Sequence, residues 1–364
     1  MITTTIFPGR YVQGYNALKY LGEEGARFGT RALLLADPFV HTRILPDLLP
    51  TLQETITPLV EPFGGECSDE EIERLVQIGR TGGVEFVIGI GGGKTLDTAK
   101  AVAHAIKLPV IIVPTIASTD APCSALSVIY TPDGQFKRYL FLPKNPDVVL
   151  VDTRIIVQAP ARFLISGMGD ALATWFEAES CQIKQAPNMT GRLGSMTAYA
   201  LARLCYETLL TYGVEAVTAN QAGVVTPAFE KVVEANTLLS GLGFESGGLA
   251  AAHAIHNGLT ALAPTHHYYH GEKVAIGTLA SLFLTGKSPA VINEVYSFCE
   301  AVGLPTTLGE IGLTEVSDED LMRAAEKACA PGETIHNELG EVTPQKVFMA
   351  LKAADAEGRR RKGK

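Results

Sequence analysis

The stretch VEFVIGIGGGKTLDTAK at residues 84–100 joins an apolar run to three consecutive glycines and the start of a helical pattern. Successive glycines let the backbone approach a phosphate closely, and the first N–H groups of a helix face an anion. Neither G-x-x-x-x-G-K-[ST] nor G-x-G-x-x-G fits, because Ile88 and Lys94 occupy glycine positions of those patterns. The stretch predicts a strand, a tight turn and a helix that bind pyrophosphate, with Lys94 as a charge partner. The alternative is a turn without a ligand.

Similar apolar runs lie on both sides of this stretch, at 31–37, 109–114 and 147–152. Nearly continuous apolar strands separated by helices are typical of a parallel sheet that is covered on both faces. One intervening helix is predicted over residues 68–80, where Ser68 and Glu71 have the spacing of a capping box. The pattern therefore predicts an α/β domain.

Two further features follow the strand at 109–114. The loop at 114–124 has small hydroxyl side chains and one carboxylate, which suit a cofactor or a polyhydroxy substrate, or else only a helix cap and a turn. Strand-like stretches at 124–130 and 135–142 flank Thr131-Pro132-Asp133-Gly134, which is typical turn chemistry. We expect a hairpin there, which either lines a ligand site or covers a sheet edge.

The strand signal stops after Asp152, and helical spacing follows. It is evident at 198–209, 224–242, 289–302 and 318–329. We expect residues 1–154 to form the α/β domain and residues 155–364 an all-helical domain. A cleft between two such domains is the natural place for a ligand.

Composition excludes several classes of function. The 364 residues are 46% hydrophobic and 19% charged, with 30 Lys and Arg against 39 Asp and Glu for a net charge of −9. This balance argues against nucleic acid or an anionic membrane as a partner. No apolar run approaches the about 20 residues that span a bilayer. With scattered cysteines and no signal-peptide pattern, the expected location is cytoplasmic. The basic residues 359–364 are expected to form a solvated, frayed tail.

One carboxylate ends the first apolar strand. Asp37 could hold the ribose hydroxyls of adenosine and repel a 2′-phosphate, which would favour NAD over NADP. It precedes the glycine loop, whereas the acidic residue of a dinucleotide fold usually follows that loop.

Five of the eight histidines fall within residues 252–271. His253 and His256 are three residues apart and share one helix face, and His270 opens the next helical stretch. Such a cluster indicates a divalent metal, although a histidine in an Ala-rich helix can also be a core residue. Asp170 lies near the expected start of an apolar helix, where it could complete the site or be stabilised by the helix dipole.

Four motifs resemble the bacterial glycerol dehydrogenases, a branch of the iron-containing (group III) alcohol dehydrogenase family. They are GGGKTLDTAK at 91–100, PTIASTDAP at 114–122, GDALATWFEA at 169–178 and HAIHNG at 253–258. The resemblance extends from Pro8 to about residue 355. It implies a dehydroquinate synthase-like fold, with a dinucleotide-binding α/β domain followed by an all-helical metal-binding domain, and a homo-oligomer that is commonly an octamer.

The resemblance also implies roles for individual residues. Asp170, His253 and His270 would hold one zinc ion per subunit, although two histidines and a carboxylate also suit iron. Asp120 would approach the glycerol hydroxyls, and His256 would face the reacting end of the site. NAD would contact Asp37, Gly93, Lys94, Thr115, Ser118, Ser124, Leu126 and Tyr130.

The activity that the resemblance implies is the reversible, NAD-dependent oxidation of glycerol to dihydroxyacetone, with related small diols as further substrates. Zinc would lower the pKa of the C2 hydroxyl, hydride would pass from C2 to the nicotinamide, and His256 or water would take the proton. The alternatives are a lyase like 3-dehydroquinate synthase and a glycerol-1-phosphate dehydrogenase. Both need Lys and Arg for a phosphate substrate, and residues 167–178 and 247–272 contain neither. A non-catalytic NAD-binding protein would not need Asp170, His253 and His270 together.

Overall fold

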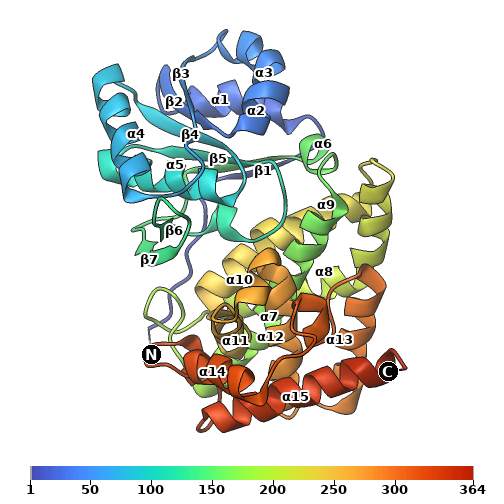
Figure 1. The fold of residues 1–364 in the computed structure, drawn as a ribbon. Helices are drawn as coiled ribbons and strands as arrows, with labels where there is room; N and C mark the ends of the chain where they lie inside the picture. Colours follow the sequence, from blue (N-terminus) through green and yellow to red (C-terminus); the bar gives the residue numbers. More distant parts are fainter. Residues whose placement is uncertain (1, 364) are drawn as a thin grey trace. The chain divides into compact units, whose positions relative to one another are not determined.

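The computed structural model describes residues 2–363, which divide into two compact units (Figure 1). We call Ile6–Pro160 together with Ala222–Val225 the N-terminal unit, and the rest of the described chain the helical unit.

The N-terminal unit contains a six-stranded sheet with the order β1-β8-β5-β4-β2-β3, in which every pair is parallel. The strands are β1 (Tyr11–Gly14), β2 (Arg31–Ala36), β3 (Thr57–Pro62), β4 (Phe86–Gly91), β5 (Val110–Pro114) and β8 (Val148–Asp152). The four apolar runs in the sequence are confirmed as β2, β4, β5 and β8. The two edge strands were not predicted from the sequence. Strand β1 is short, and β3 is largely exposed and therefore lacks an apolar run.

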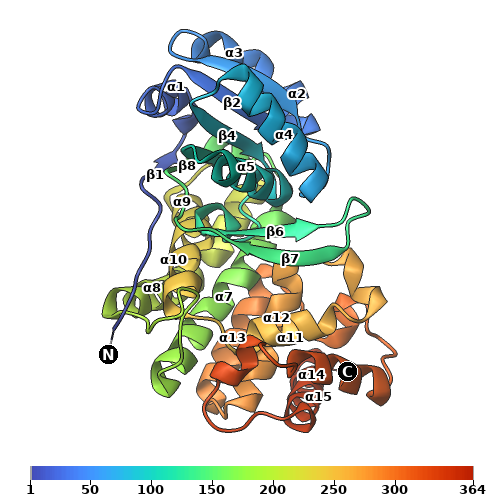
Figure 2. The same ribbon diagram turned by 90° about the vertical axis from the view of Figure 1, so that its left-hand side faces the viewer.

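Helices cover both faces of this sheet. They are α1 (Leu21–Gly25), α2 (Pro38–Arg43), α3 (Leu45–Leu52), α4 (Asp69–Gly82), α5 (Gly93–Ile106) and α6 (Thr153–Ile156). Alternate residues of β4, Ile88 and Ile90, pack with Leu48 of α3 in one core, and α4 and α5 lie on the opposite face (Figure 2). The chain runs outward from β2 to β3 and then returns past β2 to β4. This reversal makes a topological switch point between β2 and β4, where open α/β sheets bind ligands.

Two predictions of local structure can be compared with the fold, the hairpin at 124–142 and the capping box at Ser68. The hairpin is confirmed as β6 (Leu126–Tyr130) and β7 (Phe136–Phe141), which pair antiparallel. The Ser68 side chain caps α4 by accepting from Glu71 N at 3.2 Å. The second half of the predicted capping box is wrong, because the Glu71 carboxylate instead accepts from Gly64 N at 2.8 Å and binds Arg74.

Helices make up the regular structure of the helical unit. They are α7 (Ala161–Lys184), α8 (Met196–Gln221), α9 (Pro227–Glu234), α10 (Ser240–Gly247), α11 (Ala251–Leu259), α12 (His270–Leu284), α13 (Pro289–Val302), α14 (Asp318–Ala328) and α15 (Pro344–Arg361). No helix in residues 2–363 is long and apolar enough to cross a bilayer.

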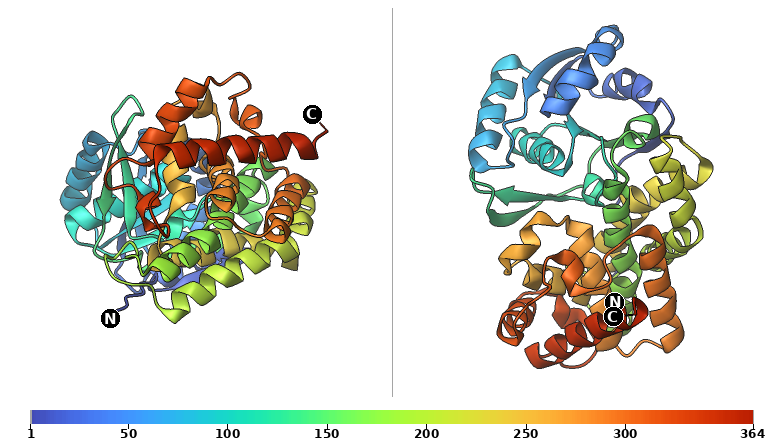
Figure 3. Two further views of the ribbon diagram at one scale, coloured as in Figure 1. Left: turned by 90° about the horizontal axis from the view of Figure 1, so that it is seen from below. Right: turned by 45° about the vertical axis from the view of Figure 1, so that its right-hand side comes forward.

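The expectation of a frayed basic tail is wrong for residues 359–361. They form the last turn of the long helix α15 (Figure 3). The guanidinium of Arg361 contacts both carboxylate oxygens of Glu300 at 2.8 Å, so tertiary ion pairing extends the helix to this point.

Candidate functional site

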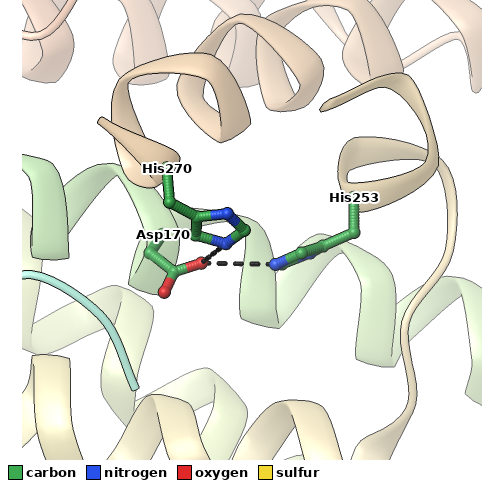
Figure 4. A group of neighbouring side chains, drawn as sticks. All are labelled: Asp170, His253 and His270. Atoms are coloured by element: carbon green, nitrogen blue, oxygen red, sulfur yellow. Dashed lines mark hydrogen bonds and ion pairs between the residues drawn. The ribbon is translucent and has the colours of Figure 1, made fainter. Parts of the chain in front are cut away.

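Three side chains from three helices converge inside the helical unit (Figure 4). Asp170 Oδ1 lies 3.2 Å from His253 Nε2 and 3.1 Å from His270 Nε2. One ligand atom from each residue lies within 4.8 Å of the other two. Asp170 is buried in the interior of α7, not at its start, so the helix dipole does not account for it. The structure thus brings together the ligand set that the resemblance implies.

Close packing of α7 against α12 brings Asp170 to His270. A Cβ atom on Gly271 would lie 1.7 Å from the carbonyl oxygen of Ser166, so only glycine permits this approach of the two backbones. Gly271 follows His270 directly, and Ser166 lies one helical turn before Asp170. The missing side chain therefore sets the separation at which the two ligands meet.

The charges of the cluster are coupled. Burial alone would raise the pKa of Asp170, but the imidazoles of His270 and His253 outweigh it and hold that pKa well below its usual range. Burial would lower the pKa of His253, yet the carboxylates of Glu177 and Asp170 raise it well above its usual value. A proton held between these groups must leave when a metal binds.

The donor set fits a divalent metal. With Zn–N and Zn–O bonds of about 2.0–2.1 Å, neighbouring ligands of a tetrahedral ion lie about 3.3 Å apart. The separations of 3.1 and 3.2 Å from Asp170 Oδ1 are close to this value. Three protein ligands leave a coordination position open, which is typical of catalytic rather than structural sites.

A fourth residue, which the sequence analysis missed, supports His253. The carboxylate of Glu177 lies 2.6 Å from His253 Nδ1 and is almost completely buried. Glu177 follows Asp170 by seven residues, which is about two helical turns and the same face of α7. That spacing was available in the sequence as a signal.

His256 lies in the same cluster but contacts a ligand instead of acting as one. Its Nε2 is 3.1 Å from His270 Nδ1, and its Nδ1 is 3.1 Å from Asn257 Oδ1. The Asn257 amide donates to Glu333 at 3.0 Å, so its oxygen accepts from Nδ1–H of His256. His256 Nε2 can then accept from Nδ1–H of His270, so the neutral form of His270 carries its lone pair on Nε2, towards Asp170. Burial is the main cause that lowers the pKa of His256 well below its usual value, and the nearby charges of His270 and Lys273 lower it further.

The N-terminal unit brings Asp37 and the glycine loop together at the switch point. Asp37 directly follows β2 and accepts from Gly92 N at 3.3 Å and, as the N-cap of α2, from Val40 N at 2.9 Å. A Cβ atom on Gly91, whose φ is +154°, would lie 2.6 Å from Asp37 Oδ2, so the turn requires glycine. Gly92 occupies the N-cap position of α5 but has no side chain that could accept from the first N–H groups of the helix. The space where a Cβ of Gly93 would lie is open. This uncapped helix start is shaped to receive a phosphate.

Lys94 lies beside this helix start, as predicted, and has a partner. Its ammonium contacts the carboxylate of Glu66 at 2.6 Å and lies 4.9 Å from the ring centre of Tyr130. Thr115 N donates to Gly91 O at 3.1 Å, which ties the end of β5 to the glycine loop. A phosphate bound here would share Lys94 with Glu66.

The remaining predicted residues lie on the segment after β5. Ser118 and Asp120 belong to the loop 115–120, Ser124 follows a short 3₁₀ turn, and Leu126 begins β6. The buried ammonium of Lys100 holds this segment, because it donates to the carbonyls of Ala121 at 2.9 Å and of Leu126. The sequence analysis missed this role of Lys100.

Comparison with known proteins identifies the family of this chain. Residues 8–153 match the family model of iron-containing alcohol dehydrogenases. The chain is 70% identical to a glycerol dehydrogenase of Thermotoga maritima, over 100% of this chain and 99% of that protein. It is 54% identical to a glycerol dehydrogenase of Pseudomonas putida, over 96% of each. The crystal structure of glycerol dehydrogenase from Schizosaccharomyces pombe superposes with a TM-score of 0.94 at 43% identity, over 100% of this chain and 93% of that one. This chain is an oxidoreductase of the iron-containing alcohol dehydrogenase family, in the branch that contains the glycerol dehydrogenases.

Proposed function

We propose that this chain catalyses the reversible, NAD-dependent oxidation of glycerol to dihydroxyacetone, and of related small diols, with one zinc ion per subunit. The observation that carries the proposal is the convergence of Asp170, His253 and His270 on one point. The identity of the relatives named above supports glycerol as the substrate.

Each group has a role in this proposal. Asp170, His253 and His270 hold the metal, which when bound supplies a Lewis acid that lowers the pKa of the alcohol. Asp120 orients the substrate hydroxyls, and a nearby water or His256 takes the proton. Because a polyol is uncharged, the substrate needs hydrogen-bond partners instead of a cluster of Lys and Arg.

NAD is proposed as the cofactor on the strength of the switch-point geometry. The start of α5 can receive the pyrophosphate, and Asp37 can accept from the ribose, since two of its oxygen lone-pair positions remain after the bonds from Val40 and Gly92. Thr115, Ser118, Ser124, Leu126 and Tyr130 would complete the cofactor site.

The test is net NADH formation from NAD and glycerol with protein stripped by a chelator and then supplied with zinc. We expect NADH only after zinc is restored, and none from Asp170→Asn treated in the same way. Absence of net NADH with every small diol, while NAD and zinc both bind, would overturn the proposal in favour of a lyase like 3-dehydroquinate synthase. NADH from glycerol 1-phosphate alone would favour a glycerol-1-phosphate dehydrogenase.

We also propose a cytoplasmic location and assembly into a homo-oligomer. The resemblance to the glycerol dehydrogenases implies an octamer. All six cysteines are free thiols, which suits a reducing compartment. Light scattering on the purified protein tests the assembly, and a monomer at micromolar concentration would contradict it.

A further inference from the structure

We propose that Glu177 is a positioning residue of the metal centre, which fixes the tautomer and the ring orientation of His253. The inference rests on the proposed metal binding and is independent of which alcohol reacts. It assigns to Glu177 a task that none of the three ligands can perform for itself.

The carboxylate of Glu177 forms a hydrogen bond with the imidazole ring of His253. Glu177 Oε2 lies 2.6 Å from His253 Nδ1, and an ionised carboxylate can only accept. The proton of a neutral His253 therefore resides on Nδ1. Nε2 then presents its lone pair on the side of Asp170 Oδ1, 3.2 Å away, where the metal would bind. Partners of this kind usually orient metal-binding histidines.

The same carboxylate holds the backbone from which His253 projects. Glu177 Oε1 accepts from Ala250 N and from His253 N, both at 2.9 Å. Helix α11 has no side-chain cap of its own, and Ala250 has φ −145° and ψ −121°, outside the regions that L-residues favour. Glu177 thus fixes both the Cα position and the ring orientation of His253.

Glu177 is also deeply buried. Glu177 has 1% of its surface exposed, and a buried carboxylate is costly unless it is compensated. Its three N–H donors provide that compensation, and all three belong to the start of α11. An acid placed only for packing would have no need to aim one oxygen at a ligand ring.

Glu338 supplies a matched control. It is also buried, with 4% of its surface exposed, and Oε1 accepts from Ala251 N at 3.1 Å. It therefore caps the same helix start, but through the backbone of Ala251 and not through the imidazole. Loss of a helix cap and loss of ring orientation can be separated by comparing the two residues.

The experiment compares Glu177→Gln and Glu338→Gln with the wild-type chain in zinc affinity, measured by competition with a chromophoric chelator without substrate. In Glu177→Gln the amide oxygen can still accept from the two backbone N–H groups, which turns the NH₂ group towards Nδ1. The proton of His253 then moves to Nε2, and we expect zinc to bind about 10–100-fold more weakly. In Glu338→Gln we expect unchanged zinc affinity. The visible spectrum of bound cobalt should change only in Glu177→Gln.

Equal zinc affinity in wild type and Glu177→Gln would overturn the inference, as would equal weakening in both variants. A wild-type measurement covers the case in which Glu177→Gln does not fold. In the long-range ¹H–¹⁵N spectrum of the zinc-loaded chain, we expect His253 to be protonated at Nδ1 with a strongly downfield proton, and a proton on Nε2 would overturn the inference. If the wild-type chain binds no zinc at all, the proposed function fails instead.

Discussion

The carboxylate of Asp37 accepts a hydrogen bond from the backbone N–H of Gly92 at 3.3 Å, although 55 positions separate the two residues. The bond joins the end of β2 to the glycine loop after β4. It is possible because β2 and β4 are neighbours in the sheet, with Ala36 opposite Ile90. An acidic residue that precedes the loop in the sequence thereby lies beside it in the fold.

Replacing Asp37 by Asn should relax the choice of cofactor. The amide keeps an acceptor for Val40 N, so the cap of α2 survives, but the negative charge that would repel a 2′-phosphate is removed. We expect the ratio of kcat/KM for NAD to that for NADP to fall about tenfold or more, as for the loss of about 1.4 kcal/mol of discrimination. The control Asp37→Ala loses the cap as well and should cost about 1 kcal/mol of stability. An unchanged ratio in Asp37→Asn would contradict the predicted ribose contact.

Replacing Lys100 by Met should destabilise the N-terminal unit. The buried ammonium lies 2.9 Å from Asp97 Oδ1 and holds the segment that follows β5. Removing one partner of a buried ion pair costs about 3–5 kcal/mol, because the other charge is left uncompensated. We expect a loss of this size in urea unfolding, with a raised KM for NAD.

Two companion variants test the cause of that loss. The double variant Lys100→Met/Asp97→Asn should recover part of the stability, since it removes the orphaned charge. Lys94→Met, on the same helix but 43% exposed in its side chain, should change stability by less than about 1 kcal/mol. A full loss in the double variant would mean that the hydrogen bonds to the segment matter more than the ion pair.

His256→Asn should lower the turnover of glycerol and leave the zinc content intact. The three ligands Asp170, His253 and His270 remain, whereas a group proposed to take the proton is gone. We expect turnover to fall about 100-fold, as for the loss of a general base. Zinc is measured by elemental analysis on the same sample at saturating zinc. A sample that no longer holds one zinc per chain would make His256 a determinant of metal binding instead.

Arg361→Ala should destabilise the helical unit through the end of α15. Its side chain is only 14% exposed and contacts Glu300, Asn293 and Ser297 at 2.8 Å. Charge-assisted hydrogen bonds of this kind contribute about 1–3 kcal/mol in total after the loss of competing water contacts. The neighbouring Arg360, 70% exposed, is the control, and its replacement by Ala should leave the unfolding midpoint unchanged. Equal effects of the two variants would contradict a specific role for Arg361.

Glu310 should make stability depend on pH in the acid range. Burial would raise the pKa of Glu310, but the ammonium of Lys362 and the N–H of Thr306 outweigh it and leave the pKa below its ordinary value. Because the pKa of Glu310 is lower in the folded chain than the unfolded value of 4.5, its ionised carboxylate stabilises the fold above pH 4.5. This stabilisation is lost as the pH falls through the pKa of the folded chain. The stability difference between wild type and Glu310→Gln should therefore be present at pH 7 and shrink as the pH falls below 4.5. A constant difference would show that the Gln variant acts through packing alone.

Local patterns in the sequence determined most of the secondary structure. The apolar runs of β2, β4, β5 and β8 and the turn between β6 and β7 could be predicted because each depends on neighbouring residues. Burial on both faces produces a continuous apolar run, whereas the exposed edge strand β3 produces none. The turn at the glycine loop was equally predictable, since the close approach of Asp37 and Thr95 to Gly91 leaves no room for a side chain.

The two sites were decided by tertiary structure. Spacing alone put His253 and His256 on one helix face, and the choice of Asp170 and His270 as ligands came from the resemblance to a family. The folded chain directs His253 towards Asp170, which is 83 positions away, and His256 towards His270 Nδ1. A local pattern states which face of a helix is buried but not which helix covers it. The partners of Asp37, Glu177 and Lys100 depend on strand order and helix packing, and these arise only when distant segments meet.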